Sequence, residues 1–434
     1  MTVTLDQLAA LRCDDQPRGI TSVCSAHPLV LRAALRRGRE TGATVLIEAT
    51  CNQVNHRGGY TGMTPADFAQ LVMKIAGEVS CPPGQILLGG DHLGPTPWRE
   101  RTVGEALSEA ESMVAAYVGA GFRKIHLDTS RGCKGEPIAL GDETTADRTV
   151  RLAAVAEKTA RSTGREMPVY VIGTEVPPPG GADHTLTAIK PTSLDAARRT
   201  IEIHRALFHK ANLGDAFSRV IAVVVQPGVA FGNRNVIFYD SDKTKDLVRL
   251  LADEPQFVFE AHSTDYQGQQ PLCDLVKNGF GILKVGPELT FVLREALYAL
   301  DLIATDLLPD YGNRPLYTVM ERLMLAYPRN WNRRYDGGEA EKRVLRHYSF
   351  SDRIRYYWAK PEAQAAVDRL IGTLSGRRVP MPLFHQHLPG AGHLADTPLD
   401  ASELLVWRVE QILNQYHAAC HAHCASQAVD SSPG

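Results

Sequence analysis

The sequence predicts an α/β fold, namely a (β/α)8 TIM barrel followed by a helical C-terminal extension. Eight short apolar runs, each followed by a helical pattern, alternate between residues 19 and 308. That number of repeats in that length fits a closed barrel better than an open doubly wound sheet. No GxGxxG motif follows the first apolar run, which counts against a dinucleotide-binding sheet.

The eight expected strands are short and rich in apolar and β-branched residues, as buried parallel strands are. In chain order we place them at 19–25, 43–49, 85–90, 123–128, 168–174, 219–225, 256–261 and 281–286. A short helix is expected before the barrel, at residues 5–15. Gly42 is expected just past the end of the first barrel helix, while Thr64 and Pro65 are typical of an N-cap and a first helical residue.

The character of the chain changes after the eighth repeat. We therefore divide it into a barrel at 1–308, a helical extension at 309–425 and a disordered tail at 426–434. The helical patterns of the extension need an apolar partner surface, so we expect it to pack on the barrel. These patterns lie around residues 319–325, 363–374 and 404–412.

Composition and charge argue against several classes of partner. The chain has 434 residues, of which 22% are charged, and a formal net charge of −2, so no basic field favours nucleic acid or a membrane surface. We interpret the basic and aromatic stretch 329–358 as a solvated helical face or a subunit interface, as in a homo-oligomer. No apolar run reaches the roughly 18 residues that span a bilayer, and the N-terminus lacks the basic region of a signal peptide. The scattered cysteines form no CxxC pair and are expected as free thiols, which favours the cytoplasm.

The stretch QILLGGDHLGP at residues 85–95 carries the strongest functional signal. Its apolar run ends on Asp91 and His92, which places both at the carboxyl end of a barrel strand, where barrel enzymes hold their catalytic groups. The other strands supply further polar residues at or near the same end, so we expect an active site there. These residues are Glu48, Asn52, His126, Asp128, Glu175, Gln226, Glu260, His262, Asp265 and Lys284.

Two histidines and several acids from different strands can bind a divalent metal and leave a coordination position open. We expect His92 and His262 to bind the metal, zinc by preference, with Asp91 and Glu175 as catalytic groups that move protons. An alternative for the Asp-His pair is a structural role at the barrel end. His126 lies two residues inside its strand end and is expected to pack or to support the site. Substrate binding is assigned to Asn52, Asp128, Gln226, Glu260, Asp265 and Lys284.

Six segments stand in this order along the chain: GGDHLGP, HLDTSRG, IGTEVPPPGG, VVQPGVAFGN, FEAHSTDYQ and LKVGPELTFVLREALYAL. Together they resemble the GatZ/KbaZ family, over nearly the whole chain. The resemblance implies a barrel distantly similar to the catalytic class II aldolases. It also implies a non-catalytic subunit that keeps the catalytic subunit of class II D-tagatose-1,6-bisphosphate aldolase stable and active, in galactitol or N-acetylgalactosamine catabolism. Members have been labelled tagatose-6-phosphate kinases as well, but no GxxxxGK[ST] loop supports a kinase here.

The resemblance also bears on single residues. Catalytic class II aldolases carry an Asp-His pair after the third strand, which Asp91 and His92 match; this implies that the Asp moves the proton and the His binds zinc. His262 matches a zinc-binding histidine after the seventh strand. After the sixth strand this chain has Gln226 in place of a histidine, and STDYQ replaces the phosphate-binding loop. A phosphate would then depend on backbone amides after the seventh and eighth strands.

Two functions stay open at this point. The first is an accessory subunit that binds a catalytic class II tagatose-bisphosphate aldolase. The second is a metal-dependent enzyme in its own right, which cleaves or epimerises a ketose or a ketose phosphate through a retro-aldol or enediolate step. Bound divalent metal would favour the enzyme over the scaffold.

Overall fold

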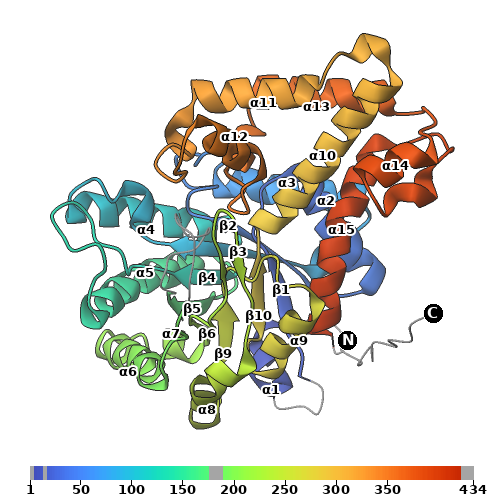
Figure 1. Ribbon diagram of the computed structural model, residues 1–434. Coiled ribbons are helices and arrows are strands. Elements are labelled where there is room, and N and C mark those ends of the chain that lie inside the picture. Colours follow the sequence, from blue (N-terminus) through green and yellow to red (C-terminus); the bar gives the residue numbers. More distant parts are fainter. Residues whose placement is uncertain (1–3, 13–16, 175–188, 422–434) are drawn as a thin grey trace.

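A computed structural model describes residues 4–12, 17–174 and 189–421. Eight parallel strands close into a barrel, and neighbours in the ring are neighbours in chain order, which confirms the predicted (β/α)8 fold (Figure 1). Each predicted strand segment overlaps one of them, and β2 and β3 extend past the predicted ends by one and three residues. The strands are β1 (Ile20–Val23), β2 (Val45–Thr50), β3 (Ile86–Leu93), β4 (Lys124–Leu127), β5 (Val169–Gly173), β6 (Val220–Val224), β9 (Val258–Ala261) and β10 (Ile282–Val285).

Helices cover the outside of this barrel, and their ends follow from local chemistry. The Thr64 side chain accepts a hydrogen bond from the Asp67 amide ahead of α3 (Pro65–Glu78), as the sequence predicted. Helix α2 (Pro28–Thr41) ends at Gly42, whose φ of 67° suits a residue without a Cβ. The remaining main barrel helices are α4 (Val103–Gly119), α5 (Asp142–Thr163), α6 (Leu194–Lys210), α8 (Lys245–Asp253), α9 (Gln269–Lys277) and α10 (Pro287–Leu307).

The structure departs from the sequence-based expectations in local details. The loop after β6 folds into a short antiparallel pair, β7 (Ala230–Phe231) and β8 (Val236–Ile237), where a plain loop was expected. The expected helix at 5–15 is a 3-10 turn followed by α1 (Leu8–Leu11) within the described residues. The expectation of free thiols is wrong at Cys273, which is disulfide-bonded. The described cysteines that are free are Cys24, Cys51, Cys81, Cys133 and Cys420.

The amino end of the barrel is closed by apolar side chains. Leu5 and Leu8, which precede β1, are buried in a cluster with inward-facing residues of the strands, including Leu46, Val171 and Ile282. Figure 1 shows α1 below this end of the barrel. Ligands must therefore reach the barrel interior from its carboxyl end, where the polar strand ends lie.

The residues after α10 form a helical extension that packs on the barrel. In Figure 1, α11 (Pro315–Ala326) and α13 (Pro361–Leu374) lie above the barrel, while α15 (Ala401–Cys420) runs down its side. Tyr416 of α15 donates a hydrogen bond to the Thr264 carbonyl at 2.8 Å, and Arg408 pairs with Glu295 of α10 at 2.9 Å. The extension also contains α12 (Glu339–Tyr348), the 3-10 turn η7 (Arg353–Tyr357) and α14 (Met381–His387). The predicted tail at 426–434 lies outside the described residues.

Within the described part of the chain, no helix combines the length and the apolar character needed to cross a membrane.

Candidate metal centre and active site

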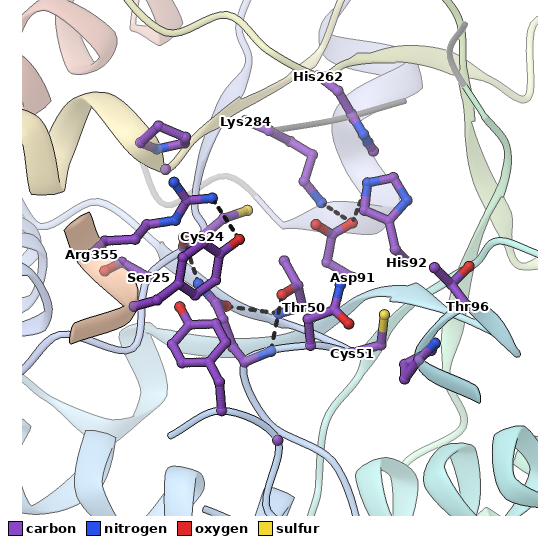
Figure 2. A pocket seen from close by; sticks show the side chains of 18 of the residues that line it. Cys24, Ser25, Thr50, Cys51, Asp91, His92, Thr96, His262, Lys284 and Arg355 are labelled. Carbon is purple, nitrogen blue, oxygen red and sulfur yellow. Dashed lines mark hydrogen bonds and ion pairs between the residues drawn. The ribbon is translucent and has the colours of Figure 1, made fainter. Parts of the chain in front are cut away.

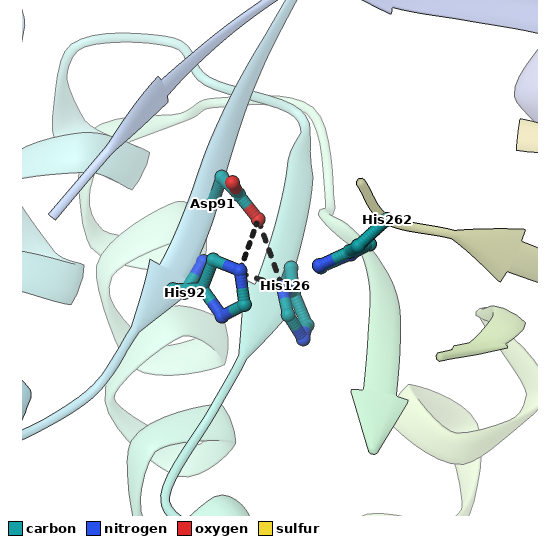
Figure 3. Close-up of side chains that lie close together, drawn as sticks. All are labelled: Asp91, His92, His126 and His262. Carbon is teal, nitrogen blue, oxygen red and sulfur yellow. Dashed lines mark hydrogen bonds and ion pairs between the residues drawn. The ribbon is translucent and has the colours of Figure 1, made fainter. Parts of the chain in front are cut away.

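Three histidines and one aspartate converge at the carboxyl end of the barrel. Asp91 and His92 come from β3, His126 from β4 and His262 directly follows β9. One potential ligand atom from each lies within 4.8 Å of the others, and all four residues are buried (Figure 3). The imidazole centroids are 4.7 Å apart for His92 and His126, 4.8 Å for His92 and His262, and 5.2 Å for His126 and His262. The structure thus brings together Asp91 and the two histidines expected as metal ligands.

An irregularity in β3 allows consecutive residues to face one site. In a regular strand Asp91 and His92 would point to opposite faces of the sheet. Here the β3–β4 register shifts between Gly90 and Leu93, and His92 has a φ of +49°. A β-branched or bulky residue rarely adopts this left-handed conformation, and the strain costs about 1–3 kcal/mol. Both side chains consequently line the same cavity.

Carboxylates behind two of the imidazoles fix their orientation. The Nδ1 of His92 donates to Asp128 at 2.8 Å, and Asp128 in turn accepts from the Ser130 hydroxyl at 2.7 Å. The Nε2 of His262 donates to Glu260 at 2.7 Å. Such pairs hold the tautomer and raise the basicity of metal-binding histidines. The Nε2 of His92 is buried, has no hydrogen-bond partner among the residues that the structure describes, and faces the cluster as a ligand would.

His126, which was expected to pack or to support the site, lies within this cluster. Its Nε2 donates to the Gly173 carbonyl at 3.0 Å, so a neutral ring carries its lone pair on Nδ1. Burial lowers the pKa of His126, which favours that neutral form. Nδ1 accepts a hydrogen bond from the His92 amide at 3.2 Å and lies 2.9 Å from Asp91 Oδ1. Three imidazoles and a carboxylate within ligand distance of one another form a donor set that fits a divalent metal.

A layer of buried charges supports the cluster from inside the barrel. Lys124 lies 2.7 Å from both Glu48 and Glu260, and Lys284 lies 3.1 Å from Glu48 and 2.5 Å from Asp91. None of these side chains is more than 5% exposed. Burial alone would lower the pKa of Lys284, but Asp91 and the neighbouring acids raise it well above its usual value. Lys284 is therefore a cation that holds Asp91 in place.

The charges around Asp91 favour its ionised form. Burial alone would raise the pKa of this carboxyl, but the charges of His92 and Lys284 bring it well below its usual range. Asp91 is consequently an anion at neutral pH, able to accept a proton or to approach a metal.

A cavity of about 3170 Å³ opens above the cluster. Of the residues assigned to substrate binding, Asn52, Asp128, Gln226, Asp265 and Lys284 line it. Glu260 is fully buried beside Lys124 and His262 and is not among the lining residues, so it supports His262 instead of meeting a substrate. Glu175, expected to be catalytic, lies outside the described residues.

The loops after β9 and β10 do not offer the phosphate seat that the sequence suggested. Asp265 accepts hydrogen bonds from the amides of Gly286 at 3.0 Å and Glu288 at 2.8 Å, at the start of α10. Glu288 in turn accepts from the Tyr266 amide at 2.7 Å. The Asp265 carboxylate thus occupies two amides at this helix N-terminus, and a phosphate there would meet its negative charge. Burial raises the pKa of Asp265 to about 6 and that of Glu288 to about 8.

Replacing Glu288 by glutamine should make the protein more stable at alkaline pH. The folded state holds the Glu288 proton up to a pKa of about 8, whereas its ordinary value is 4.5. Between pH 4.5 and about pH 8 the native state therefore binds more protons than the unfolded state. The free energy of unfolding of the wild type consequently falls as the pH rises through this range. Urea unfolding should show the advantage of Glu288→Gln growing by roughly 2–4 kcal/mol from pH 5 to pH 9. Parallel stability curves for the two proteins would contradict this account.

Sequence reasoning missed the contribution of the extension. Arg353, Arg355 and Tyr356 of η7 line the cavity together with Arg334. Part of the stretch interpreted as a solvated face or subunit interface therefore faces the site. The available signal was the concentration of arginine and tyrosine in RIRYYWAK, which sequence alone could not place above the barrel.

Fold and site together define a (β/α)8-barrel protein with a buried His/Asp cluster able to bind a metal. The chain belongs to the family described as D-tagatose-1,6-bisphosphate aldolase subunit GatZ/KbaZ-like, whose model matches residues 5–421. This confirms the resemblance inferred from the sequence.

Two relatives are similar over almost the full length. A D-tagatose 6-phosphate 4-epimerase from Agrobacterium fabrum is 55% identical over 419 residues, covering 96% of this chain and 99% of the relative. A crystal structure of a protein described as a probable tagatose 6 phosphate kinase from Sinorhizobium meliloti 1021 is 50% identical, with a TM-score of 0.85. The match covers 93% of this chain and all of that one.

Proposed function

We propose that this chain is itself a metal-dependent enzyme that epimerises a ketose 6-phosphate at C4, interconverting D-tagatose 6-phosphate and D-fructose 6-phosphate. The observation that carries the proposal is the convergence of Asp91, His92, His126 and His262 in one buried cluster at the end of the barrel. Each imidazole has its second nitrogen committed to a fixed acceptor, an arrangement that a scaffold does not need. The 4-epimerase relative, 55% identical, supports the choice of reaction.

The chemistry of the substrate favours a retro-aldol route. The hydrogen on C4 is not adjacent to the C2 carbonyl, so its direct removal would leave a carbanion without stabilisation. Removal of the proton from the C4 hydroxyl instead breaks the C3–C4 bond. The products are an aldehyde, glyceraldehyde 3-phosphate, and the enediolate of the three-carbon ketone. Rotation of the aldehyde, re-formation of the C3–C4 bond and return of the proton to O4 complete the epimerisation, with all atoms conserved.

The residues of the cluster fit this route. His92, His126 and His262 would hold the metal, and three nitrogen ligands suit Zn²⁺ with a position left open. The bound cation would supply Lewis-acid polarisation of the ketose carbonyl. Asp91, kept ionised by Lys284, takes the O4 proton and returns it to the re-formed alcohol. Asp128 and Glu260 keep His92 and His262 oriented throughout.

A second candidate follows from the family description, which names an aldolase subunit. In that role the chain would bind and stabilise a catalytic class II aldolase. No GxxxxGK[ST] loop is present to support the kinase label of the crystallised relative.

Incubation of the purified chain with D-tagatose 6-phosphate in D2O tests the proposal. Carbon and proton NMR should show D-fructose 6-phosphate that keeps protium at C4, because the C4–H bond survives a retro-aldol step. Deuterium at C4 would contradict the route. Absence of the epimer with zinc, manganese or cobalt supplied would contradict the function.

A further inference from the structure

The extension places a basic wall over the cavity that contains the metal centre. Among the described residues of the extension that line this cavity, six are basic and only Asp368 is acidic. The basic ones are Arg329, Arg333, Arg334, Arg353, Arg355 and Lys360. Figure 2 shows Arg355 on one side of the pocket, with Asp91, His92, His262 and Lys284 on the other. The wall and the cluster thus line the same cavity.

Arg355 is held in place by neutral groups. Its guanidinium donates to the Ser351 and Asp352 carbonyls and, at 3.1 Å, to the Tyr356 hydroxyl. Within the described ranges of the chain, no carboxylate forms an ion pair with it. The Asp352 side chain instead accepts from Thr290 at 2.6 Å and faces Arg294 at 3.5 Å. The positive charge of Arg355 is therefore fixed in direction but is not neutralised by these contacts.

Neighbouring arginines add to the positive charge around Arg355. Arg334, Arg353 and Arg355 line the same cavity, and burial together with the charges of Arg355 and Arg334 lowers the pKa of Arg353. The same cations outweigh burial and lower the pKa of the Tyr356 hydroxyl. Tyr356 packs edge-on against Tyr60, with ring centroids 4.7 Å apart, and so joins the wall to the loop after β2. Closely spaced arginines beside a tyrosine hydroxyl match the donors that a phosphate monoester needs.

The alternative seat on the barrel is blocked. A phosphate bound by a barrel of this kind would be expected at the loops after the last two strands. Here Asp265 already accepts from the amides of Gly286 and Glu288. With that site occupied, the arginines of the extension offer an alternative site for an anion among the described residues of the cavity.

We propose that Arg355, assisted by Arg353 and Arg334, binds the phosphate of the substrate, so that the helical extension selects a phosphorylated ketose. The identity of the sugar in this inference rests on the proposed function. The existence of the phosphate-binding site does not. In this arrangement the carbonyl end of the ketose lies at the His/Asp cluster, and the phosphate at the other end of the sugar binds to the arginines of η7. Arg355 is then a binding residue, contributed by a segment far in sequence from the strand ends.

Isothermal titration of the full chain tests the seat without requiring turnover. The ligands are inorganic phosphate, D-tagatose 6-phosphate and unphosphorylated D-tagatose. Arg355→Met should weaken binding of the two phosphorylated ligands by roughly tenfold to a hundredfold, as expected for loss of charged hydrogen bonds. Affinity for unphosphorylated D-tagatose should change far less. Arg355→Lys keeps the positive charge but not the planar guanidinium with its paired N–H donors. Its affinity for the phosphorylated ligands should therefore fall by less than that of Arg355→Met.

The matched control is Arg322→Met, which removes an exposed arginine of α11 that does not line the cavity and should leave all three affinities unchanged. The proposed phosphate site would be contradicted if Arg355→Met lost the same affinity for D-tagatose as for D-tagatose 6-phosphate. It would also be contradicted if this variant bound phosphate as tightly as the wild type. If Arg355→Met fails to fold, the same titrations are made with Arg355→Lys and Arg334→Gln. Unchanged phosphate affinity in both variants would contradict the proposed phosphate site. A chain that binds D-tagatose 6-phosphate through Arg355 but never epimerises it would refute the proposed function and leave the seat standing.

Discussion

Asp91→Asn is expected to keep its bound metal and to lose turnover by roughly 10²–10⁴-fold, the range that one proton-transfer group contributes. The amide is nearly isosteric with the carboxylate but cannot accept the O4 proton. The histidine ligands and their carboxylate partners are unchanged in this variant, so metal content measured by mass spectrometry should stay near that of the wild type. His92→Ala, in contrast, removes a ligand and should lose both metal and activity.

The pair of variants separates two roles that Asp91 could have. Asp91 lies close enough to the histidines to be a fourth ligand. If Asp91→Asn loses metal to the same extent as His92→Ala, Asp91 is a ligand and the proton moves through another group. If His92→Ala keeps full metal content, the cluster is not the metal site.

Lys124→Met is expected to cost about 3–5 kcal/mol of folding free energy, the typical penalty for removing one partner of a buried ion pair. Lys124 is fully buried between Glu48 and Glu260, which would be left with Lys284 as their shared cation. The loss should appear in urea unfolding. Because Glu260 also orients His262, metal affinity should fall as well.

The control for this variant is Lys210→Met, at an exposed position near the end of α6, which should change stability by less than about 0.5 kcal/mol. Adding Glu48→Gln to Lys124→Met should recover part of the loss, because it removes one uncompensated charge. A Lys124→Met protein as stable as the wild type would show that the buried charge layer does not support the barrel.

The strands and the position of the site could be predicted because both follow from short-range patterns. Each strand is an apolar run of the length that parallel strands take, and polar residues such as Asp91 and His262 directly follow two of them. In a closed parallel barrel all such ends meet at one rim, so the convergence of Asp91 and His262 followed from the fold alone. That His92 faces the same cavity as Asp91 depends on the irregularity in β3.

The alternation of β4 brings His126 into the cluster although it lies inside the strand end. Lys124 and His126 of β4, and Asp128 directly after it, are two residues apart in turn, and all three are buried. The same period of two links Glu260 with His262. Applied to β4, this rule predicts that His126 lies beside His92 and His262.

The long-range contributions could not be predicted from sequence. Whether Arg355 faces solvent, another subunit or the cavity depends on how η7 sits above the barrel, which no local pattern encodes. The role of Asp265 at the start of α10 depends likewise on the path of the loop after β9, where Ser263 and Tyr266 adopt positive φ angles. Such features arise from the packing of distant segments.

The most direct test of the central claim is epimerisation by the chain alone as a function of metal content. The purified protein is stripped with a chelator, reloaded with increasing zinc, and assayed on D-tagatose 6-phosphate with no other protein present. The account predicts that turnover is absent without metal and rises in proportion to zinc, with a break near one equivalent per chain. A chain that binds no metal and converts no substrate, yet raises the activity of a class II tagatose-bisphosphate aldolase when mixed with it, would contradict the enzyme account and establish the accessory subunit.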